Sequence, residues 1–356
     1  MLAESNISVS ASWTWSAVSW NWANVLQLIL SVVGIAGNFV VMLVLLRPKR
    51  QRCSTDTLIA ALAVADFLTS VFLIPHARVN TLPDSIGSQL FCRIVHSSLF
   101  MWISICSSIF TLTTLSLEKF VAVKYPYAFQ RIFSPEKSVR YVIGIWVTSV
   151  IINAPVPFVV FFRDNQCVFG YPNMGVQILV GTLVFLLEYV IPVVVMTFAH
   201  TTTIRALNRV QKCVQPGVAK HHCPTASQPT QAQLRRARSR RKIINMFAIV
   251  VITFVVCWTP DQICYFALNV GWIAPSFLYS PLYRSFVLLA FVNSCANPFI
   301  YAARNANFRK AVREMFASIP RRSLKTVFDS VSDTPGGTQP TNQTPLASME
   351  TPSSTV

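Results

Sequence analysis

Seven apolar stretches, each about 20 residues long, dominate this chain of 356 residues. A helix that crosses the hydrocarbon core of a bilayer needs roughly 20 mostly apolar residues, so each stretch is predicted to span a membrane. The predicted spans are residues 25–46, 57–75, 94–117, 141–162, 176–198, 243–268 and 285–303. Charged residues are only 12% of the chain, whereas a soluble domain carries roughly 25%. The sequence therefore predicts an all-α fold, a seven-transmembrane helix bundle.

The basic residues predict the orientation of these spans. Of the 30 lysines and arginines, four (Arg78, Arg93, Arg163 and Arg284) lie in the gaps on one side, and all the others lie in the gaps on the opposite side. Basic loops stay in the cytosol, so we expect an extracellular N-terminus and a cytosolic C-terminus in the plasma membrane. The formal net charge of +17 does not indicate nucleic-acid binding, because the basic residues lie between apolar spans and not on one soluble face.

Four regions follow from this interpretation. Residues 1–24 are predicted to be an extracellular segment, 25–303 the bundle, 304–320 an amphipathic cytosolic helix on membrane lipid, and 321–356 a disordered cytosolic tail. Within the first region, Asn6 begins a glycosylation triplet. The tryptophans before the first span are interpreted as interfacial anchors or, alternatively, as a cover over a pocket; they are Trp13, Trp15, Trp20 and Trp22.

The cytosolic tail carries two further hypotheses about partners. It ends in Ser354-Thr355-Val356, which matches the form of a segment that adds to the sheet of a PDZ domain. Its serines and threonines are candidate phosphorylation sites for arrestin recruitment. The alternative is a featureless, solvated tail.

Polar residues within the spans occur in motifs that identify a family. Polar side chains are costly in hydrocarbon and mark functional sites. The motifs, in chain order, are Gly37-Asn38, Leu62-Ala63-Val64-Ala65-Asp66, Trp146, Pro192, Phe254, Cys257-Trp258-Thr259-Pro260 and Asn297-Pro298-Phe299-Ile300-Tyr301. Over residues 25–316 this order resembles the rhodopsin-like (class A) G-protein-coupled receptors, and within them most closely the neuropeptide receptors. The resemblance implies a non-enzymatic receptor that activates a heterotrimeric G protein and engages arrestin.

The resemblance also implies an allosteric sodium ion, although no cofactor is required. The residues implied as its surroundings are Asp66, Ser108, Asn293, Ser294 and Asn297. Their oxygen atoms suit a hard cation. The alternative is that Asp66 is protonated or hydrogen-bonded and only holds helices together.

Cys92 and Cys167 are the only pair of cysteines on the predicted outer side. Since that side is oxidising, we expect them to form a disulfide that ties the second outer loop to the third span. Cys92 lies 27 residues before Lys119, two more than the family pattern has. We therefore expect a bulge or a loosened turn at the outer end of the third span.

The candidate switch residues lie along the bundle toward the cytosol. By resemblance they are Ile109, Glu118, Lys119, Pro192, His200, Phe254, Pro260, Pro298 and Tyr301. Pro260 and Pro298 are expected to bend their helices. The chain has Glu118-Lys119-Phe120 where the family has an acid, Arg and Tyr, and His200 where the family has Tyr. Lysine lacks the planar fork of arginine, so the alternatives are weaker G-protein coupling or a bias toward arrestin, and Lys119→Arg is predicted to raise signalling.

The candidate ligand-binding residues lie at the outer ends of the spans. They are Met101, Glu188, Trp258, Asp261, Gln262, Tyr265, Tyr283 and Phe291. The buried acids need partners. These are either a cationic group of a peptide, or an internal partner such as His96 or Arg284, or a proton.

Two absences bear on the ligand class. Met101 stands where amine receptors carry Asp, and the seventh span has no lysine for a retinal Schiff base. An extracellular peptide is therefore the predicted ligand. An amine or another small molecule is the alternative, and a membrane transporter is the alternative from another class, although the chain shows no internal repeat.

Overall fold

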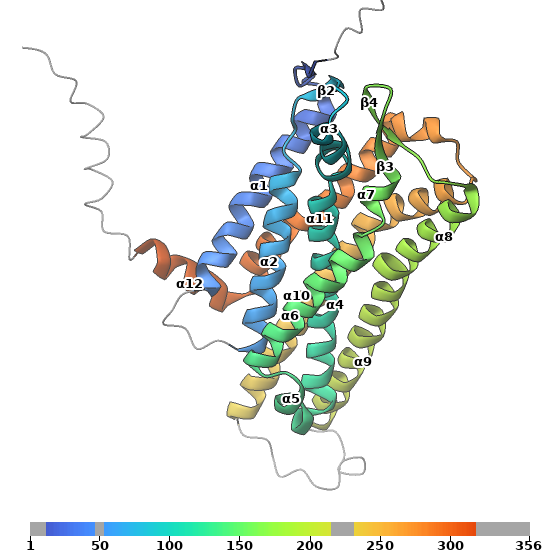
Figure 1. The fold of residues 1–356 in the computed structure, drawn as a ribbon. Coiled ribbons are helices and arrows are strands. Elements are labelled where there is room, and N and C mark those ends of the chain that lie inside the picture. The colour runs from blue at the N-terminus through green and yellow to red at the C-terminus, as the bar shows by residue number, and fades with distance from the viewer. Residues whose placement is uncertain (1–11, 47–52, 215–230, 318–356) are drawn as a thin grey trace, which may run out of the picture. The chain divides into compact units, whose positions relative to one another are not determined.

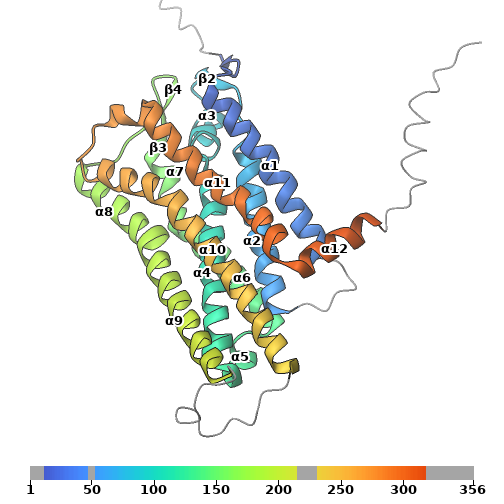
Figure 2. The same ribbon diagram turned by 180° about the vertical axis from the view of Figure 1, so that it is seen from behind.

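The computed structural model describes residues 12–46, 53–214 and 231–317. Within these ranges, seven helices are long and apolar enough to cross a membrane: Trp22–Leu45, Ser54–Phe72, Ile86–Lys124, Pro135–Val159, Met174–Asn208, Arg241–Asn269 and Pro281–Arg304. Figures 1 and 2 show these helices lying side by side as one bundle, with the strands gathered at one end and α5 at the other. The predicted seven-helix fold is confirmed.

The long helices are numbered by their place in the chain. They are α1 (Trp22–Leu45), α2 (Ser54–Phe72), α4 (Leu99–Lys124), α6 (Pro135–Asn153), α8 (Met174–Phe185), α9 (Ile191–Val214), α10 (Gln231–Asn269) and α11 (Pro281–Arg304). The short helices are α3 (Ile86–Leu90), η1 (Phe91–His96), α5 (Pro126–Ile132), α7 (Val156–Val159), η2 (Leu186–Val190), η4 (Pro275–Tyr279) and α12 (Ala306–Ala317). Helix α4 lies at the centre, since it contacts α2, α6, α9 and α10.

Side-chain caps begin several of these helices. The side chain of Asn21 accepts a hydrogen bond from the backbone N–H of Asn24 at the start of α1. Ser134, Asn173 and Ser280 do the same for α6, α8 and α11. Such a cap satisfies a backbone donor that the helix itself leaves free, and contributes about 1 kcal/mol.

The fourth predicted span was wrong at its outer end. Residues up to 162 were assigned to it, but α6 ends at Asn153, and Val160–Arg163 forms strand β3. At Pro155 the chain passes from α6 into the short helix α7 (Val156–Val159), because proline interrupts the hydrogen bonds of a helix, and β3 follows directly after α7. The apolar residues of β3 fit a strand as well as a helix, and β3 pairs with β4 (Gln166–Phe169) in an antiparallel hairpin.

The outer end of the third span has the predicted irregularity. The chain forms a π-helix, η1, and Ser98 adopts a left-handed conformation with φ of 55° before α4 begins. In η1 the N–H of Ser97 donates to the carbonyl of Cys92 at 3.2 Å. A π-turn holds more residues than an α-turn, so η1 and the turn at Ser98 accommodate the two additional residues. The predicted bulge is confirmed.

The outer loops form a continuous cap. The disulfide between Cys92 and Cys167 is present, as predicted, and joins η1 to β4. Cys92 packs there with Leu82, Val159 and Val160. Strand β1 (Thr14–Ser16) pairs with β2 (Arg78–Thr81), which follows α2.

The N-terminal tryptophans contribute to this cap. The rings of Trp13 and Trp15 stack 5.7 Å apart, and both meet the edge of Phe91. The structure therefore places these two tryptophans against the outer loops. Trp20 and Trp22 are exposed around the start of α1.

Small residues let α1 approach its neighbours closely. A Cβ atom at Gly34 would lie 2.2 Å from the hydroxyl oxygen of Ser70, and one at Gly37 would lie 2.9 Å from the ring of Pro298. Asn38 then joins α1 to α11, because its side-chain amide donates to the carbonyl of Ser294 at 2.9 Å. Close backbone approach of this kind replaces the hydrophobic effect, which does not drive helix association in lipid.

Helix α12 begins directly after α11, as expected for a short helix following the bundle. The side chain of Asn305 accepts from the N–H of Phe308 at 3.1 Å, and the Phe308 ring meets the edge of Tyr301. The placement of this helix on the inner leaflet stays a prediction. Asn6, residues 321–356 and the terminal Ser354-Thr355-Val356 lie outside the residues that the structure describes.

Candidate functional site

A cavity of about 320 Å³ lies among the outer ends of α1, α2, α4, α10 and α11. Its volume falls in the range of ligand pockets, roughly 300–1,000 Å³. Five of the eight predicted ligand-binding residues line it: Met101, Trp258, Asp261, Tyr283 and Phe291. The helices of three different spans thus bring these side chains together.

The polar lining of this cavity includes an acid, an indole N–H and two arginines, besides Asn24, Gln27, His76 and Ser98. Asp261 is buried, and its carboxyl group adjoins the hydroxyl group of Tyr283. Trp258 is also buried, and its indole N–H has no hydrogen-bond partner among the described residues. Arg78 and Arg284 line the same cavity. The cavity can therefore bind a cationic group at Asp261, an acceptor at Trp258, and further acceptors at the two arginines.

The structure does not bring Glu188 to the lining of this cavity. Glu188 lies in η2 and is 6% exposed. Its Oε1 accepts from the side-chain amide of Asn153 at 3.4 Å, and the thiol of Cys106 adjoins the same carboxyl group. An amide and a thiol are thus the internal partners of Glu188, in place of the His96 or Arg284 side chain considered from the sequence.

Gln262 and Tyr265 are the other two predicted ligand residues that do not line the cavity. Gln262 is buried with its amide oxygen unpartnered among the described residues. Tyr265 adjoins Tyr171, which lies in the loop between β4 and α8. Burial raises the pKa of Tyr171 above its ordinary value, so this phenol stays a neutral donor at physiological pH.

A polar core lies deeper in the bundle around Asp66. Asp66 is fully buried. Its Oδ1 accepts from the Ser108 hydroxyl at 2.7 Å, its Oδ2 accepts from the Asn297 amide at 2.8 Å, and Ser294 adjoins it. Three helices, α2, α4 and α11, therefore meet at this carboxyl group.

The donor atoms of this core fit a small hard cation. Such a cation takes carboxylate, hydroxyl and amide oxygens. Asp66 and Ser108 supply the first two kinds of oxygen. The side-chain oxygens of Asn293 and Asn297 are buried and, within the described ranges, have no hydrogen-bond partner, so both keep lone pairs free.

The end of the bundle that carries α5 has a compact polar cluster. The hydroxyl of Thr55 donates to Glu118 at 2.8 Å, and the ammonium group of Lys119 donates to Thr55 at 2.5 Å. Lys119 also forms an ion pair with Glu118 at 3.0 Å. All three groups are thus engaged between α2 and α4.

Lys119 also reaches α10, although without an acidic partner there. Its Nζ atom lies 5.1 Å from the centre of the Phe247 ring. The chain has no Asp or Glu between Glu188 and Asp261, so neither α9 nor the cytosolic half of α10 offers a carboxylate. The contact between α4 and α10 at this point is therefore a cation–π interaction.

The remaining switch residues lie between the cavity and this cluster. Ile109 and Phe254 are buried, and the ring of Phe254 lies 6.5 Å from that of Trp258. Pro260 and Pro298 lie inside α10 and α11. Pro192 is the second residue of α9, directly after the π-turn η2.

His200 and Tyr301 are buried without partners. The two ring nitrogens of His200 form no hydrogen bond with any residue in the described part of the chain. The same is true of the hydroxyl group of Tyr301. A buried polar group without a partner costs about 1–3 kcal/mol. Two of the predicted switch positions therefore hold a buried polar group that no described protein group satisfies in this packing.

Sequence reasoning missed three residues of these clusters: Thr55, Phe247 and Asn153. Asn153 had a signal, since it is an amide inside a predicted span. Because the chain has no acid between Glu188 and Asp261, Lys119 has no ion-pair partner on the nearby half of α10. This absence does not indicate which aromatic ring contacts Lys119 instead. Thr55 and Phe247 carried no signal of their own.

Comparisons with known proteins bear on these sites. Residues 37–301 match the model of a family described as 7 transmembrane receptor (rhodopsin family). The chain is 29% identical over 322 residues to galanin receptor 2b of Danio rerio, which covers 86% of this chain and 79% of that receptor. It is 30% identical over 308 residues to the allatostatin-A receptor of Bombyx mori, with 82% and 78% covered. It is 27% identical over 310 residues to galanin receptor type 2 of Rattus norvegicus, with 85% and 77% covered.

Proposed function

This chain belongs to the rhodopsin family of seven-transmembrane receptors, and from that premise we propose that its extracellular ligand is a peptide. The family is non-enzymatic, its members are multi-pass membrane proteins, and membership implies coupling to a G protein. The alternative of a transporter is thereby set aside. The similar receptors are named for galanin and allatostatin-A, and this supports a peptide for the present chain.

Asp261 in the outer cavity is the observation that carries the proposal. A basic side chain or a terminal amine of the peptide pairs with its carboxyl group, beside the hydroxyl of Tyr283. A backbone carbonyl of the peptide accepts from the buried N–H of Trp258. Arg78 and Arg284 then face further carbonyl or carboxylate groups. An amine ligand has less support, because the two residues of α4 that line the cavity, Met101 and Trp102, are not acids.

The test is a peptide-library screen on cells that express the full chain, with G-protein activation and arrestin recruitment measured in parallel. For any active peptide with a basic group, Asp261→Asn is expected to lower potency at least tenfold, because removing one partner of a buried charge pair costs about 2–5 kcal/mol. Asp164→Asn is the matched control, since its carboxylate lies on the outer hairpin with its side chain 90% exposed. Equal potency of the Asp261→Asn variant and the wild type contradicts the role of Asp261, and activation by non-peptide compounds alone contradicts the peptide proposal.

The orientation and the cellular membrane belong to the same proposal. The disulfide lies at the end of the bundle that holds the cavity. At the other end lie three basic residues, Arg131 in α5 and Lys137 and Arg140 in the first turns of α6. The positive-inside rule then favours an extracellular cavity and a cytosolic α5 in the plasma membrane.

Sodium binding at Asp66 is a second, separate proposal about this receptor. It is supported by the carboxylate, the Ser108 hydroxyl and the free amide oxygens of Asn293 and Asn297. The ion would neutralise a buried charge that is costly in the bilayer. The residues would hold it in the resting packing, so that its loss accompanies activation.

A further inference from the structure

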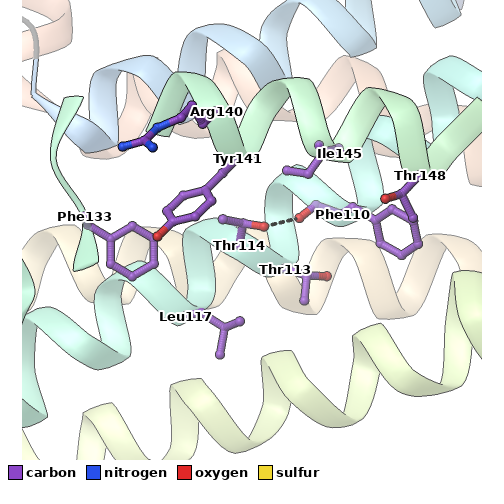
Figure 3. A pocket seen from close by; sticks show the side chains of 10 residues that line it. Phe110, Thr113, Thr114, Leu117, Phe133, Arg140, Tyr141, Ile145 and Thr148 are labelled. Carbon is purple, nitrogen blue, oxygen red and sulfur yellow. Dashed lines mark hydrogen bonds between the residues drawn. The ribbon is translucent and has the colours of Figure 1, made fainter. Parts of the chain in front are cut away.

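A groove of about 500 Å³ lies between α4 and α6 in their cytosolic halves, separate from the outer cavity (Figure 3). Phe110 and Leu117 line it from α4, and Gly144 and Thr148 line it from α6. Leu117, Gly144 and Thr148 are exposed although both helices span the membrane. The medium that covers an exposed face of two spanning helices is lipid.

The floor of the groove is apolar in spite of its threonines. The hydroxyl of Thr113 donates to the carbonyl of Ile109 at 2.9 Å. The hydroxyl of Thr114 donates to the carbonyl of Phe110 at 2.8 Å, and Figure 3 shows this second bond. Since both hydroxyl hydrogens are used within α4, these side chains offer methyl groups. At Gly144 an added Cβ atom would meet nothing within 4 Å, so the groove is open at that point.

The length of the groove matches one leaflet of a bilayer. From Arg140 to Thr148 the rise along α6 is about 12 Å, and half of the hydrocarbon core is about 15 Å thick. One acyl chain of a cytosolic-leaflet phospholipid therefore fits along it.

The cytosolic end of the groove carries a positive charge. Arg140 is exposed there, and no carboxylate in the described part of the chain forms an ion pair with its guanidinium group. The neighbouring Tyr141 is already engaged, since its hydroxyl donates to the carbonyl of Ile132 at 2.9 Å. Phospholipids with anionic headgroups are found in the cytosolic leaflet, so the charge of Arg140 complements them.

We propose that this groove is a binding site for a phospholipid of the cytosolic leaflet, with its anionic headgroup at Arg140 and one acyl chain over Gly144. The site also contacts the segment that follows α4. The rings of Phe133 and Tyr141 lie 5.6 Å apart at the end of the groove, and Phe133 stacks on Phe129 of α5. A bound lipid therefore adds contacts to the residues that hold α5 against α6.

The test uses the full chain in phosphatidylcholine nanodiscs that contain a trace of a photoactivatable lipid with a diazirine in its acyl chain. The probe is phosphatidylserine in one arm, phosphatidylcholine in a second and a sterol in a third, and the labelled peptides are mapped by mass spectrometry. Phosphatidylserine is expected to label residues 110–117 and 141–148 about fivefold more than phosphatidylcholine does, the effect of roughly one basic residue at an anionic surface.

Paired variants separate the groove from the surrounding surface. Arg140→Gln is expected to reduce phosphatidylserine labelling to the phosphatidylcholine level, and Arg140→Lys to restore it. Gly144→Phe, which fills the groove, is expected to abolish labelling by both lipids. The controls are Arg131→Gln, an exposed arginine outside the lining, and Ile143→Phe, which places the same ring at the exposed position next to Gly144, outside the lining. Each control is expected to label like the wild type.

Three results overturn the proposal. They are equal labelling by phosphatidylserine and phosphatidylcholine, labelling that survives Gly144→Phe, and stronger labelling by the sterol than by phosphatidylserine. Melting curves of each variant without ligand identify any loss of folding. Should Arg140→Gln fail to fold, the labelling of Arg140→Lys and the comparison of the two phospholipids on the wild type still test the proposal. The assignment to the cytosolic leaflet rests on the proposed orientation of the receptor. The measurement itself needs no ligand and no G protein, so its failure is distinguishable from failure of the peptide proposal.

Discussion

The ammonium group of Lys119 on α4 lies 5.1 Å from the centre of the Phe247 ring on α10. Phe247 shares one face of α10 with Phe254, Trp258 and Asp261, since these residues follow one another at intervals of seven, four and three. All four are buried. One face of α10, the helix that contains Pro260, thus connects the acid of the outer cavity with the cation at the opposite end of the bundle.

Weakening the contact between Lys119 and Phe247 is expected to raise basal signalling. A cation–π interaction contributes about 0.5–2 kcal/mol, so its loss should shift the resting equilibrium roughly 2- to 30-fold toward the active packing. Stepwise fluorination of the Phe247 ring removes the attraction while the ring keeps its shape. Basal nucleotide exchange on the G protein is expected to rise with each added fluorine, whereas Met246→Leu, at the buried position before it, leaves it unchanged. A flat response to fluorination contradicts this role of Phe247.

Lys119→Arg is predicted to increase agonist-driven activation of the G protein. Arginine presents a planar fork with five donors, and it can hold a partner in the active packing while the lysine offers a single point charge. The measurement is the agonist-stimulated nucleotide exchange rate in nanodiscs, with Lys124→Arg on the same helix as the control. Unchanged or lower exchange in the Lys119→Arg receptor would count against the prediction.

Sodium is predicted to lower agonist affinity through Asp66. If the ion binds in the resting packing alone, it stabilises that packing by mass action and competes with the agonist. Raising sodium chloride at constant ionic strength, with choline chloride as the balancing salt, should lower affinity in the wild type and have no effect in Asp66→Asn. Ser108→Ala should weaken the effect, and Ser107→Ala, its buried neighbour, should not. The proposal fails when the wild type shows no response to sodium.

Asn153→Ala is predicted to lower stability and leave ligand potency almost unchanged. It removes the amide that donates to Glu188, and a buried carboxyl group that loses a partner costs about 1–3 kcal/mol. The purified receptor should therefore melt at a lower temperature. Peptide potency at the outer cavity should stay within about threefold of the wild type, because sites that do not touch usually change each other's free energies by only a few tenths of a kcal/mol. A large loss of potency with unchanged melting would instead place Glu188 among the ligand contacts. Ser149→Ala, one turn away on α6, is the comparison.

Part of the candidate site could be predicted from single residues. Polar side chains are costly in hydrocarbon, which singled out Asp66, Ser108 and Asn297. The family motifs then implied that these three side chains meet, and the structure joins them by hydrogen bonds. Asp261 and Glu188 were indistinguishable by the same reasoning, since both are acids in the outer half of a span. Only the structure separates them, with Asp261 in the cavity and Glu188 against Asn153.

Hydropathy and charge along the chain were enough to predict the seven spans and their alternating direction, because a segment in lipid must satisfy its own backbone hydrogen bonds as a helix. The break at the outer end of the third span was predicted from the spacing of 27 residues between Cys92 and Lys119, two more than the family pattern has. Tertiary structure decided which side chains meet. Two π-turns, η1 and η2, change the rotational phase of every residue around them, and α6 ends ahead of Pro155, before the hairpin of β3 and β4. The direction of the Glu188 side chain follows from this packing and from no local pattern. The same holds for the partner of Lys119 on α10, whose only acid, Asp261, lies near the opposite end of that helix.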